Sequence, residues 1–284
     1  VLGDLFHSVR DHLADVLVAG GNSRNLLDVI LALEPDGRCP MWQQDGLCRI
    51  QAQLGEDALC HTCRMFPRLR HDYGDFVELG LELSCPEAAR LILSGADQDT
   101  VSKAVPGGEA PEYDEEVMAT LRRTRAEFLQ FLKETALSVP QILSVLLLYA
   151  HEVQEELDGG MEATLSPEAC LADAARFAQD ADSKGLAEFF LGLEILTEGW
   201  KERLNKPLKK PQWDARYRAL LRYFIERYWL QAVSDYDILC RAKFAIIACL
   251  LIGLLGGDLV QTAQLFSKEI ENAQDNIEAL FFHN

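Results

Sequence analysis

Cysteines are the residues in this chain whose type and spacing most clearly predict chemistry. The 284-residue sequence contains eight of them, and five lie close together, namely Cys39, Cys48, Cys60, Cys63 and Cys85. The pair Cys60 and Cys63 has C-x-x-C spacing, which lets two thiolates bind one metal ion, or two irons of one cluster, without strain in the chain. The other three can complete the ligand shell from neighbouring loops. The pattern predicts a metal or iron–sulfur site, and it leaves zinc and iron open because four sulfurs suit both.

Two other interpretations of these thiols compete with metal binding. Buried free cysteines pack like small hydrophobic residues, and this is our interpretation of Cys170, Cys240 and Cys249, which have no second ligand nearby in the sequence. A redox disulfide between Cys60 and Cys63 is the main competitor within the cluster itself. Against it, the strand–CxxC–helix pattern of redox proteins does not surround this pair.

The segments that flank the thiols predict a small module of mixed structure. Apolar periodicity predicts helices over Leu2–Val18 and Arg24–Leu33, and a short helical piece over Cys48–Leu54. Alternating apolar residues predict a β-hairpin over Leu69–Leu83, with its turn at Tyr73-Gly74-Asp75.

A helix is then expected to begin at Cys85 and to run through Leu93. Ser84 and Glu87 have the spacing of a capping box, and Pro86 is tolerated in the first turn because its missing N–H needs no partner there. The helix dipole at this position favours the thiolate form of Cys85.

After a polar segment that contains Pro106-Gly107-Gly108, the sequence predicts helices only. Their ranges are Glu112–Ala136, Pro140–Leu157, Pro167–Gln179, Lys184–Leu204, Gln212–Val233, Tyr236–Leu255 and Leu259–Phe282. The predicted fold class is therefore mainly α, with a small Cys-rich module and a short β-hairpin followed by an irregular multi-helix bundle. The predicted domains are 1–97 for the N-terminal helices and the Cys-rich module, 98–111 for a linker, and 112–284 for the helical domain.

Charge and hydropathy exclude some classes of partner. The net charge of −18 opposes binding to a nucleic-acid backbone, whereas it favours solubility or a basic partner such as a lysine-bearing segment. The longest apolar segments, Val139–Ala150 and Phe244–Leu255, have the length of buried helices, so we expect no membrane span. The first residues show no signal-peptide pattern. Clustered thiols without a signal peptide favour a cytoplasmic protein.

An aromatic stripe at helical spacing is the remaining candidate feature. Aromatic faces attract sulfonium or methylated ammonium groups, but packing in a helical core is the simpler interpretation. The stripe consists of Trp213, Tyr217, Phe224 and Tyr228.

The order of several short motifs resembles one known family. The pieces are Cys39-Pro40, Asp45-Gly46-Leu47-Cys48-Arg49-Ile50, Leu54-Gly55-Glu56, Thr62-Cys63, Phe66-Pro67-Arg68 and Leu83-Ser84-Cys85-Pro86-Glu87-Ala88-Ala89-Arg90. In content, order and spacing they resemble the core of the flagellin lysine-N-methylases, which belong with the zinc- or iron-chelating cysteine-cluster proteins. The resemblance covers roughly residues 30–95.

The resemblance implies S-adenosylmethionine-dependent methylation of lysines on flagellin, with a cysteine-bound iron–sulfur cluster (4Fe–4S favoured) or zinc. It also implies Cys39, Cys48, Cys63 and Cys85 as the ligands, to which the C-x-x-C spacing adds Cys60. Such proteins usually open with a further Cys-rich segment. Either this segment was trimmed or disordered upstream of Val1, or this protein lacks it, and in both cases we expect the site in this sequence to lack part of its thiols.

The sequence identifies no catalytic base and no Rossmann-type glycine loop that would bind S-adenosylmethionine. The alternative function is a non-enzymatic metal- or cluster-binding module whose helical bundle docks another protein.

Overall fold

The computed structural model describes residues 17–19, 29–31, 34–35, 38–94, 101–105, 112–159, 166–171 and 183–282. The chain divides into two compact units, Val1–Phe66 and Pro67–Asn284. The described residues are mainly helical with small antiparallel sheets, which confirms the predicted fold class. The division falls inside the range 1–97 predicted for the Cys-rich module, and the predicted domain limits remain a prediction.

The first unit contains short elements only. Strands β1 (Leu17–Ala19) and β2 (Val29–Leu31) pair antiparallel. The predicted helices over Leu2–Val18 and Arg24–Leu33 are therefore wrong where the structure describes them, because Val, Ile and Leu pair well across strands. The rest of both ranges lies outside the described residues. Three short helical segments follow: α2 (Arg49–Leu54), η2 (Glu56–Ala58) and α3 (His61–Met65).

The second unit opens with a three-stranded antiparallel sheet. Strands β3 (Arg68–Asp72) and β4 (Phe76–Leu81) form the predicted hairpin, and Gly74 in its turn has φ 88°. Strand β5 (Val101–Ala104) pairs with the other edge of β4. It lies inside the range predicted as a linker. Its four residues are all exposed, so no apolar alternation indicated a strand there.

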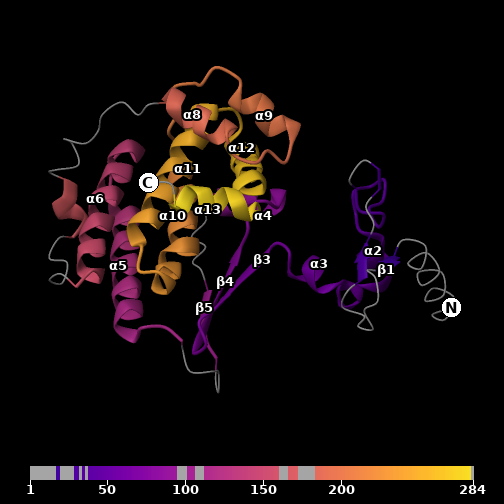
Figure 1. The fold of residues 1–284 in the computed structure, drawn as a ribbon, viewed down its shortest axis with the longest axis horizontal. Coiled ribbons are helices and arrows are strands. Elements are labelled where there is room, and N and C mark those ends of the chain that lie inside the picture. Colours follow the sequence, from indigo (N-terminus) through magenta and orange to yellow (C-terminus); the bar gives the residue numbers. More distant parts are fainter. Residues whose placement is uncertain are drawn as a thin grey trace. The chain divides into compact units, whose positions relative to one another are not determined.

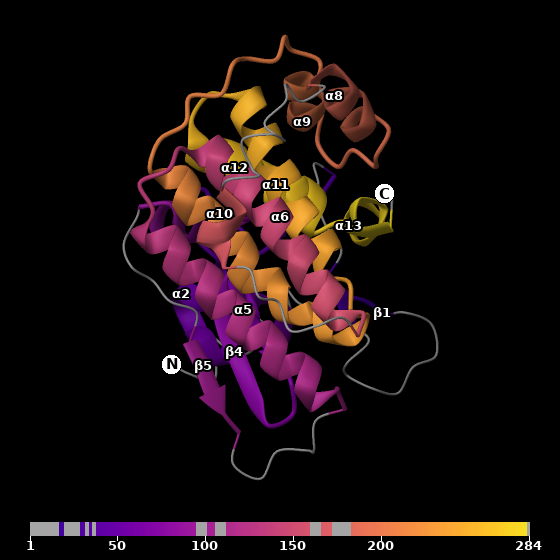
Figure 2. The same ribbon diagram turned by 90° about the vertical axis from the view of Figure 1, so that its left-hand side faces the viewer.

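Helices form the rest of the second unit. They are α4 (Pro86–Ile92), α5 (Glu115–Glu134), α6 (Val139–Leu157), α8 (Ser183–Leu191), α9 (Glu198–Leu204), α10 (Arg216–Tyr228), η3 (Trp229–Ser234), α11 (Ile238–Leu255), α12 (Leu259–Phe266), the π-helical turn η4 (Ser267–Glu271) and α13 (Gln274–Phe282). Helices α5, α6, α10 and α11 lie side by side, and α8 and α9 lie at one end of this group (Figures 1 and 2). Residues 167–171 are helical, and the remainder of the predicted helix Pro167–Gln179 lies outside the described residues.

Two predicted helices are interrupted in the structure. The range Lys184–Leu204 is broken between α8 and α9, and the range Leu259–Phe282 is broken by the π-helical turn η4. The two breaks are bonded to each other, since the Glu269 carboxylate accepts the Leu196 N–H and the Thr197 hydroxyl. Asn276 also exchanges two hydrogen bonds with the Glu194 backbone, at 2.8 and 2.9 Å. These buried polar contacts satisfy the backbone groups that each break exposes.

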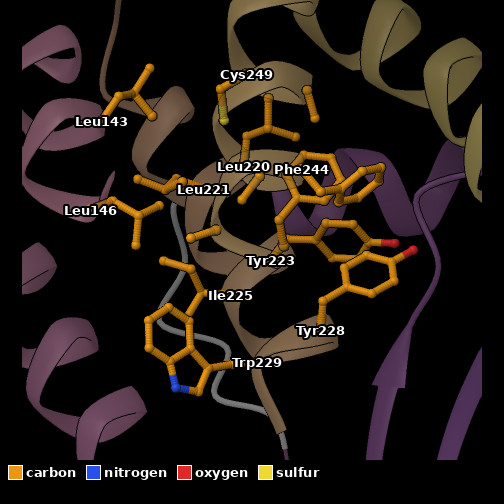
Figure 3. Packing of buried hydrophobic residues seen from close by; sticks show 14 of the residues in the cluster. Leu143, Leu146, Leu220, Leu221, Tyr223, Ile225, Tyr228, Trp229, Phe244 and Cys249 are labelled. Carbon is orange, nitrogen blue, oxygen red and sulfur yellow. The ribbon is translucent and has the colours of Figure 1, made fainter. Parts of the chain in front are cut away.

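The core of the second unit is built around α11. Within the described residues, α11 is the one helix long and apolar enough to cross a membrane, but 61% of it is buried inside the protein. It packs against α6, α10 and α12, and Phe244 and Cys249 on α11 face Leu220 on α10 (Figure 3). We interpret α11 as the central core helix. The aromatic stripe follows the core interpretation too, because Tyr217, Phe224 and Tyr228 are all buried.

Candidate metal centre

A small hairpin places Cys48 in the first unit. Trp42 and Cys48 face each other across an isolated antiparallel bridge, and the Arg49 N–H donates to the Met41 carbonyl at 2.8 Å. Gly46 closes the turn with φ 81°, a left-handed conformation that favours glycine. Met41 is buried beneath the hairpin. The hairpin therefore presents Cys48 at the N-terminal end of α2, where Cys48 is the N-cap residue.

Helix α3 brings together the two thiols of the C-x-x-C motif. Cys60 is the N-cap residue of α3 and Cys63 lies one turn later, so the two side chains share one face. The pKa of Cys60 is lowered, first by the Cys63 backbone N–H and then by a hydrogen bond from the Cys63 thiol. Burial, followed by the hydrogen bond to Cys60, raises the pKa of Cys63 to about 11. Cys60 is therefore the thiol of this pair that ionises first.

Cys63 lies within electrostatic reach of the other three cysteines of the first unit. The pKa of Cys63 is also raised by the negative charges of Cys60, Cys39 and Cys48. A metal cation would replace this mutual repulsion by attraction to each thiolate. Cys39 also borders a surface pocket of about 370 Å³, whose lining includes the half-exposed Trp42.

Cys85 belongs to the second unit and is the N-cap residue of α4. Pro86 occupies the first turn as predicted. The predicted capping box is wrong, because the Ser84 hydroxyl donates to the Glu82 carboxylate at 2.8 Å, and Glu87 pairs with Arg90 at 2.6 Å. The helix starts one residue later than a Ser84 cap would require. The half-buried Cys85 side chain makes no capping hydrogen bond of its own.

Two helices of the core hold the turn that precedes Cys85. The Gln264 amide on α12 donates to the Ser84 carbonyl at 2.8 Å. The Leu83 N–H points at the Tyr223 hydroxyl on α10, at 3.5 Å. Leu83 and Ser84 are both almost completely buried. The backbone before Cys85 is thus fixed from two sides.

Tyr223 is part of a buried polar cluster between α10 and η4. The Glu271 carboxylate accepts hydrogen bonds from Tyr223 at 3.0 Å and from Tyr228 at 2.8 Å, and it pairs with Arg227 at 3.0 Å. Figure 3 shows Tyr223 and Tyr228 side by side, with their hydroxyl groups pointing the same way. Burial and then the Glu271 charge raise the pKa of both tyrosines. Burial is the largest single influence on Arg227 and lowers its pKa, but Glu271, Tyr223 and Tyr228 together outweigh it, so the pKa of Arg227 stands well above its ordinary value.

His71 on β3 lies close to this cluster. Its Nε2 atom is buried without a hydrogen-bond partner. Burial, followed by the positive charge of Arg227, lowers the pKa of His71. Glu78, which raises it, is already paired with Arg125 at 2.5 Å. His71 is therefore neutral at pH 7.

The five predicted ligands fit a thiophilic metal or cluster in the chemistry of their donors. All five are free thiols, which are ligands that suit zinc and iron–sulfur clusters, and Cys48, Cys60 and Cys85 are N-cap residues. The residues are therefore of the right chemical type for such a metal or cluster, but their side chains are not arranged around one point. In the part of the chain that the structure describes, no three His, Cys, Asp or Glu side chains are placed to hold one ion. The ligand set remains a prediction.

Part of the chain is similar to known methylases. A stretch of 67 residues, 24% of this chain, is 45% identical to the lysine-N-methylases of Salmonella typhimurium and Salmonella choleraesuis. A stretch of 61 residues is 48% identical to the flagellar biosynthetic protein FliU of Salmonella muenchen. The matches span 17% of each lysine-N-methylase and 36% of FliU. No family model matches the chain, and no solved structure matches it.

Sequence reasoning missed the residues that hold the Cys85 turn. Tyr223 precedes Phe224 of the aromatic stripe on α10, and Arg227 and Tyr228 follow within two turns. The available signal was the presence of these polar groups within the apolar side of the helix. Gln264 and Glu271 had no local signal, because their partners lie far away in the sequence.

Proposed function

We propose that this protein is an S-adenosylmethionine-dependent protein-lysine N-methyltransferase that acts on flagellin in the cytoplasm, with a cysteine-bound iron–sulfur cluster or zinc ion. The observation that carries the proposal is the 45% identity over 67 residues to two proteins named lysine-N-methylase. The matched length is close to that of the range 30–95, in which the Cys-rich motifs lie. The name of FliU supports the flagellar link.

The reaction makes a definite demand on the chain. A methyl group leaves the sulfonium sulfur and forms a bond to a lysine nitrogen, and the nitrogen loses a proton, so the amine must reach the site unprotonated. The charge of −18 attracts a lysine-bearing segment. It also stabilises the protonated amine, so the site must remove the proton locally.

The cysteine-bound group would be held by Cys39, Cys48, Cys60, Cys63 and Cys85. When bound, a zinc ion or an iron–sulfur cluster with thiolate ligands would cross-link the Cys-rich stretch and stabilise its fold, and a cluster would add the capacity for electron transfer. The protein's own contribution is seen at Cys60, whose pKa is lowered by the Cys63 backbone N–H and then by the Cys63 thiol. At Cys63, whose pKa is raised, a bound metal would have to displace the thiol proton.

The test is methyl transfer from labelled S-adenosylmethionine to purified flagellin, with protein prepared without oxygen. We expect label on flagellin lysines, lost in Cys63→Ser and kept in Cys249→Ala, which alters a fully buried thiol outside the Cys-rich stretch. Bound iron with visible absorption would favour a cluster over zinc. Absence of label with folded, metal-loaded protein would refute the enzymatic proposal.

The surface of the first unit favours one alternative. Three of its large apolar side chains are strongly exposed: Trp42 by 53%, Leu47 by 60% and Phe66 by 47%. Trp42 and Leu47 belong to the same small hairpin, and neighbouring exposed apolar residues are typical of protein-binding surfaces. A non-enzymatic metal-binding module that docks another protein would retain flagellin on an affinity column without transferring methyl groups. Loss of this retention in Leu47→Ser, with metal content unchanged, would support the alternative.

A further inference from the structure

We propose that Tyr223 and Gln264 are positioning residues that hold the Cys85 thiol ready to bind its metal or cluster. The proposal rests on the proposed function in one respect only, the assignment of Cys85 as a ligand. It names the helices of the core, and not the Cys-rich stretch, as the structure that sets the position of this ligand.

Hydrogen bonds from other parts of the second unit hold the backbone that precedes Cys85. The turn at residues 82–85 ends strand β4 and starts helix α4, so its backbone groups leave the sheet before they join the helix. Three contacts satisfy them: the Pro67 carbonyl accepts the Glu82 N–H at 2.9 Å, the Tyr223 hydroxyl faces the Leu83 N–H, and Gln264 donates to the Ser84 carbonyl. Buried backbone groups without partners would cost free energy, so these contacts select one conformation of the turn.

Tyr223 is itself held in place by buried charged side chains. Its hydroxyl donates to Glu271, accepts from Arg227, and also lies toward the Leu83 N–H. A hydroxyl group has one proton and two lone pairs, so these three contacts use its full capacity. The buried pair of Glu271 and Arg227 thereby fixes the orientation of the phenol group that the turn needs.

The Cys85 thiol is not used for capping and stays available to bind a metal. Its side chain makes no capping hydrogen bond and is half-buried. Its neighbour Ser84 has its hydroxyl and its carbonyl engaged by Glu82 and Gln264. A residue whose backbone is fixed while its thiol stays available is arranged as metal ligands are, with outer partners that orient the donor.

Two matched pairs of variants test the proposal. Gln264→Ala removes the bond to Ser84, and Gln261→Ala alters an exposed glutamine of the same helix. Tyr223→Phe and Tyr228→Phe each remove one hydroxyl bound to Glu271 inside the same core, but only Tyr223 faces the turn. Urea unfolding of all four variants shows whether the members of each pair lose similar global stability.

The first readout is the alkylation rate of Cys85 in metal-free protein, followed by mass spectrometry of its peptide. Loss of one hydrogen bond makes local opening about fivefold more frequent. We therefore expect Cys85 to react about fivefold faster in Gln264→Ala and Tyr223→Phe. It should react at the wild-type rate in Gln261→Ala and Tyr228→Phe.

The second readout is the rate at which a chelator removes metal from loaded protein, which should rise in the same two variants. Equal Cys85 rates in Tyr223→Phe and Tyr228→Phe, or an unchanged rate in Gln264→Ala, would overturn the positioning role. Cys85→Ser separates the two proposals. If it keeps its metal as firmly as wild type, Cys85 is not a ligand and the ligand assignment fails, while the alkylation rates still decide whether the turn is held.

Discussion

Replacement of Glu271 by glutamine tests the buried polar cluster on which the second unit depends. The Glu271 side chain is fully buried, and Arg227, its partner at 3.0 Å, keeps only 11% of its side-chain surface exposed. Glutamine has the same shape but no charge. The substitution therefore leaves the volume of the core unchanged and removes only the negative partner of a buried guanidinium group.

The expected cost follows from the contacts of the carboxylate. Removal of one member of a buried ion pair costs about 3–5 kcal/mol, because the other charge stays buried and unpaired. The amide oxygen can still accept one tyrosine hydroxyl, so the lower end of this range applies. A loss of about 3 kcal/mol should lower Tm by about 6–12 °C in a unit of this size.

The assay is urea unfolding and thermal unfolding of Glu271→Gln beside Glu278→Gln, which alters an exposed glutamate on α13. The exposed variant should unfold within about 0.5 kcal/mol of wild type. The double variant Glu271→Gln/Arg227→Met also lacks the guanidinium group that would otherwise be buried without its partner, so it should regain part of the lost stability. A loss below about 1 kcal/mol in Glu271→Gln, or no recovery in the double variant, would refute the view that the ion pair is buried and mutually dependent.

Further predictions concern packing, capping, pH and metal. A Cβ atom on Gly253 would lie 3.0 Å from the Pro211 side chain, so Gly253→Ala should cost about 1 kcal/mol in urea unfolding, whereas Gly199→Ala, whose Cβ meets nothing within 4 Å, should be neutral or slightly stabilising. The Arg218 guanidinium donates to three carbonyls at the C-terminal end of α5, so Arg218→Ala should cost about 2 kcal/mol, of which Arg218→Lys recovers less than half. The pKa of His71 is lowered in the folded state, so the unfolded state binds the proton more readily and stability should fall as pH drops below 6.5; His71→Asn should flatten this pH dependence in unfolding measurements between pH 5 and 7. Metal removal by a chelator should speed protease cleavage within residues 38–66 and leave the second unit intact, and equal cleavage with and without metal would contradict this.

Helix starts in the second unit could be predicted because the residues that cap them are local in the sequence. Asp114, Asp237 and Asp258 each accept N–H groups from the first turn of the helix that follows. The β3–β4 hairpin was predictable for the same reason, since apolar alternation and a glycine turn lie within fifteen residues of each other. The aromatic spacing on α10 likewise indicated a buried face.

Contacts between distant segments set the features that the sequence did not predict. The π-helical turn η4 interrupts a long apolar pattern, because Glu269 and Glu271 must both turn inward to partners on other elements. Gln264 reaches a carbonyl 180 positions earlier in the chain. The motif around Ser84 and Glu87 had the spacing of a capping box, yet other nearby side chains bind both residues: the Ser84 hydroxyl donates to Glu82, and Glu87 pairs with Arg90. Spacing alone does not show which of several local partners a side chain will bind.

The cysteines of the two units are held in physically different ways. Helices α2 and α3, next to Cys48, Cys60 and Cys63, contain no buried residue, and within 38–66 only Met41 and Leu59 are buried apolar side chains. So few buried residues cannot repay the entropy of ordering about thirty residues, and small modules of this kind are usually stabilised by a metal, a disulfide or a partner. The backbone before Cys85, by contrast, is hydrogen-bonded to α10 and α12 of the second unit. A metal or cluster bound by the cysteines of the first unit would therefore contribute folding free energy to that unit.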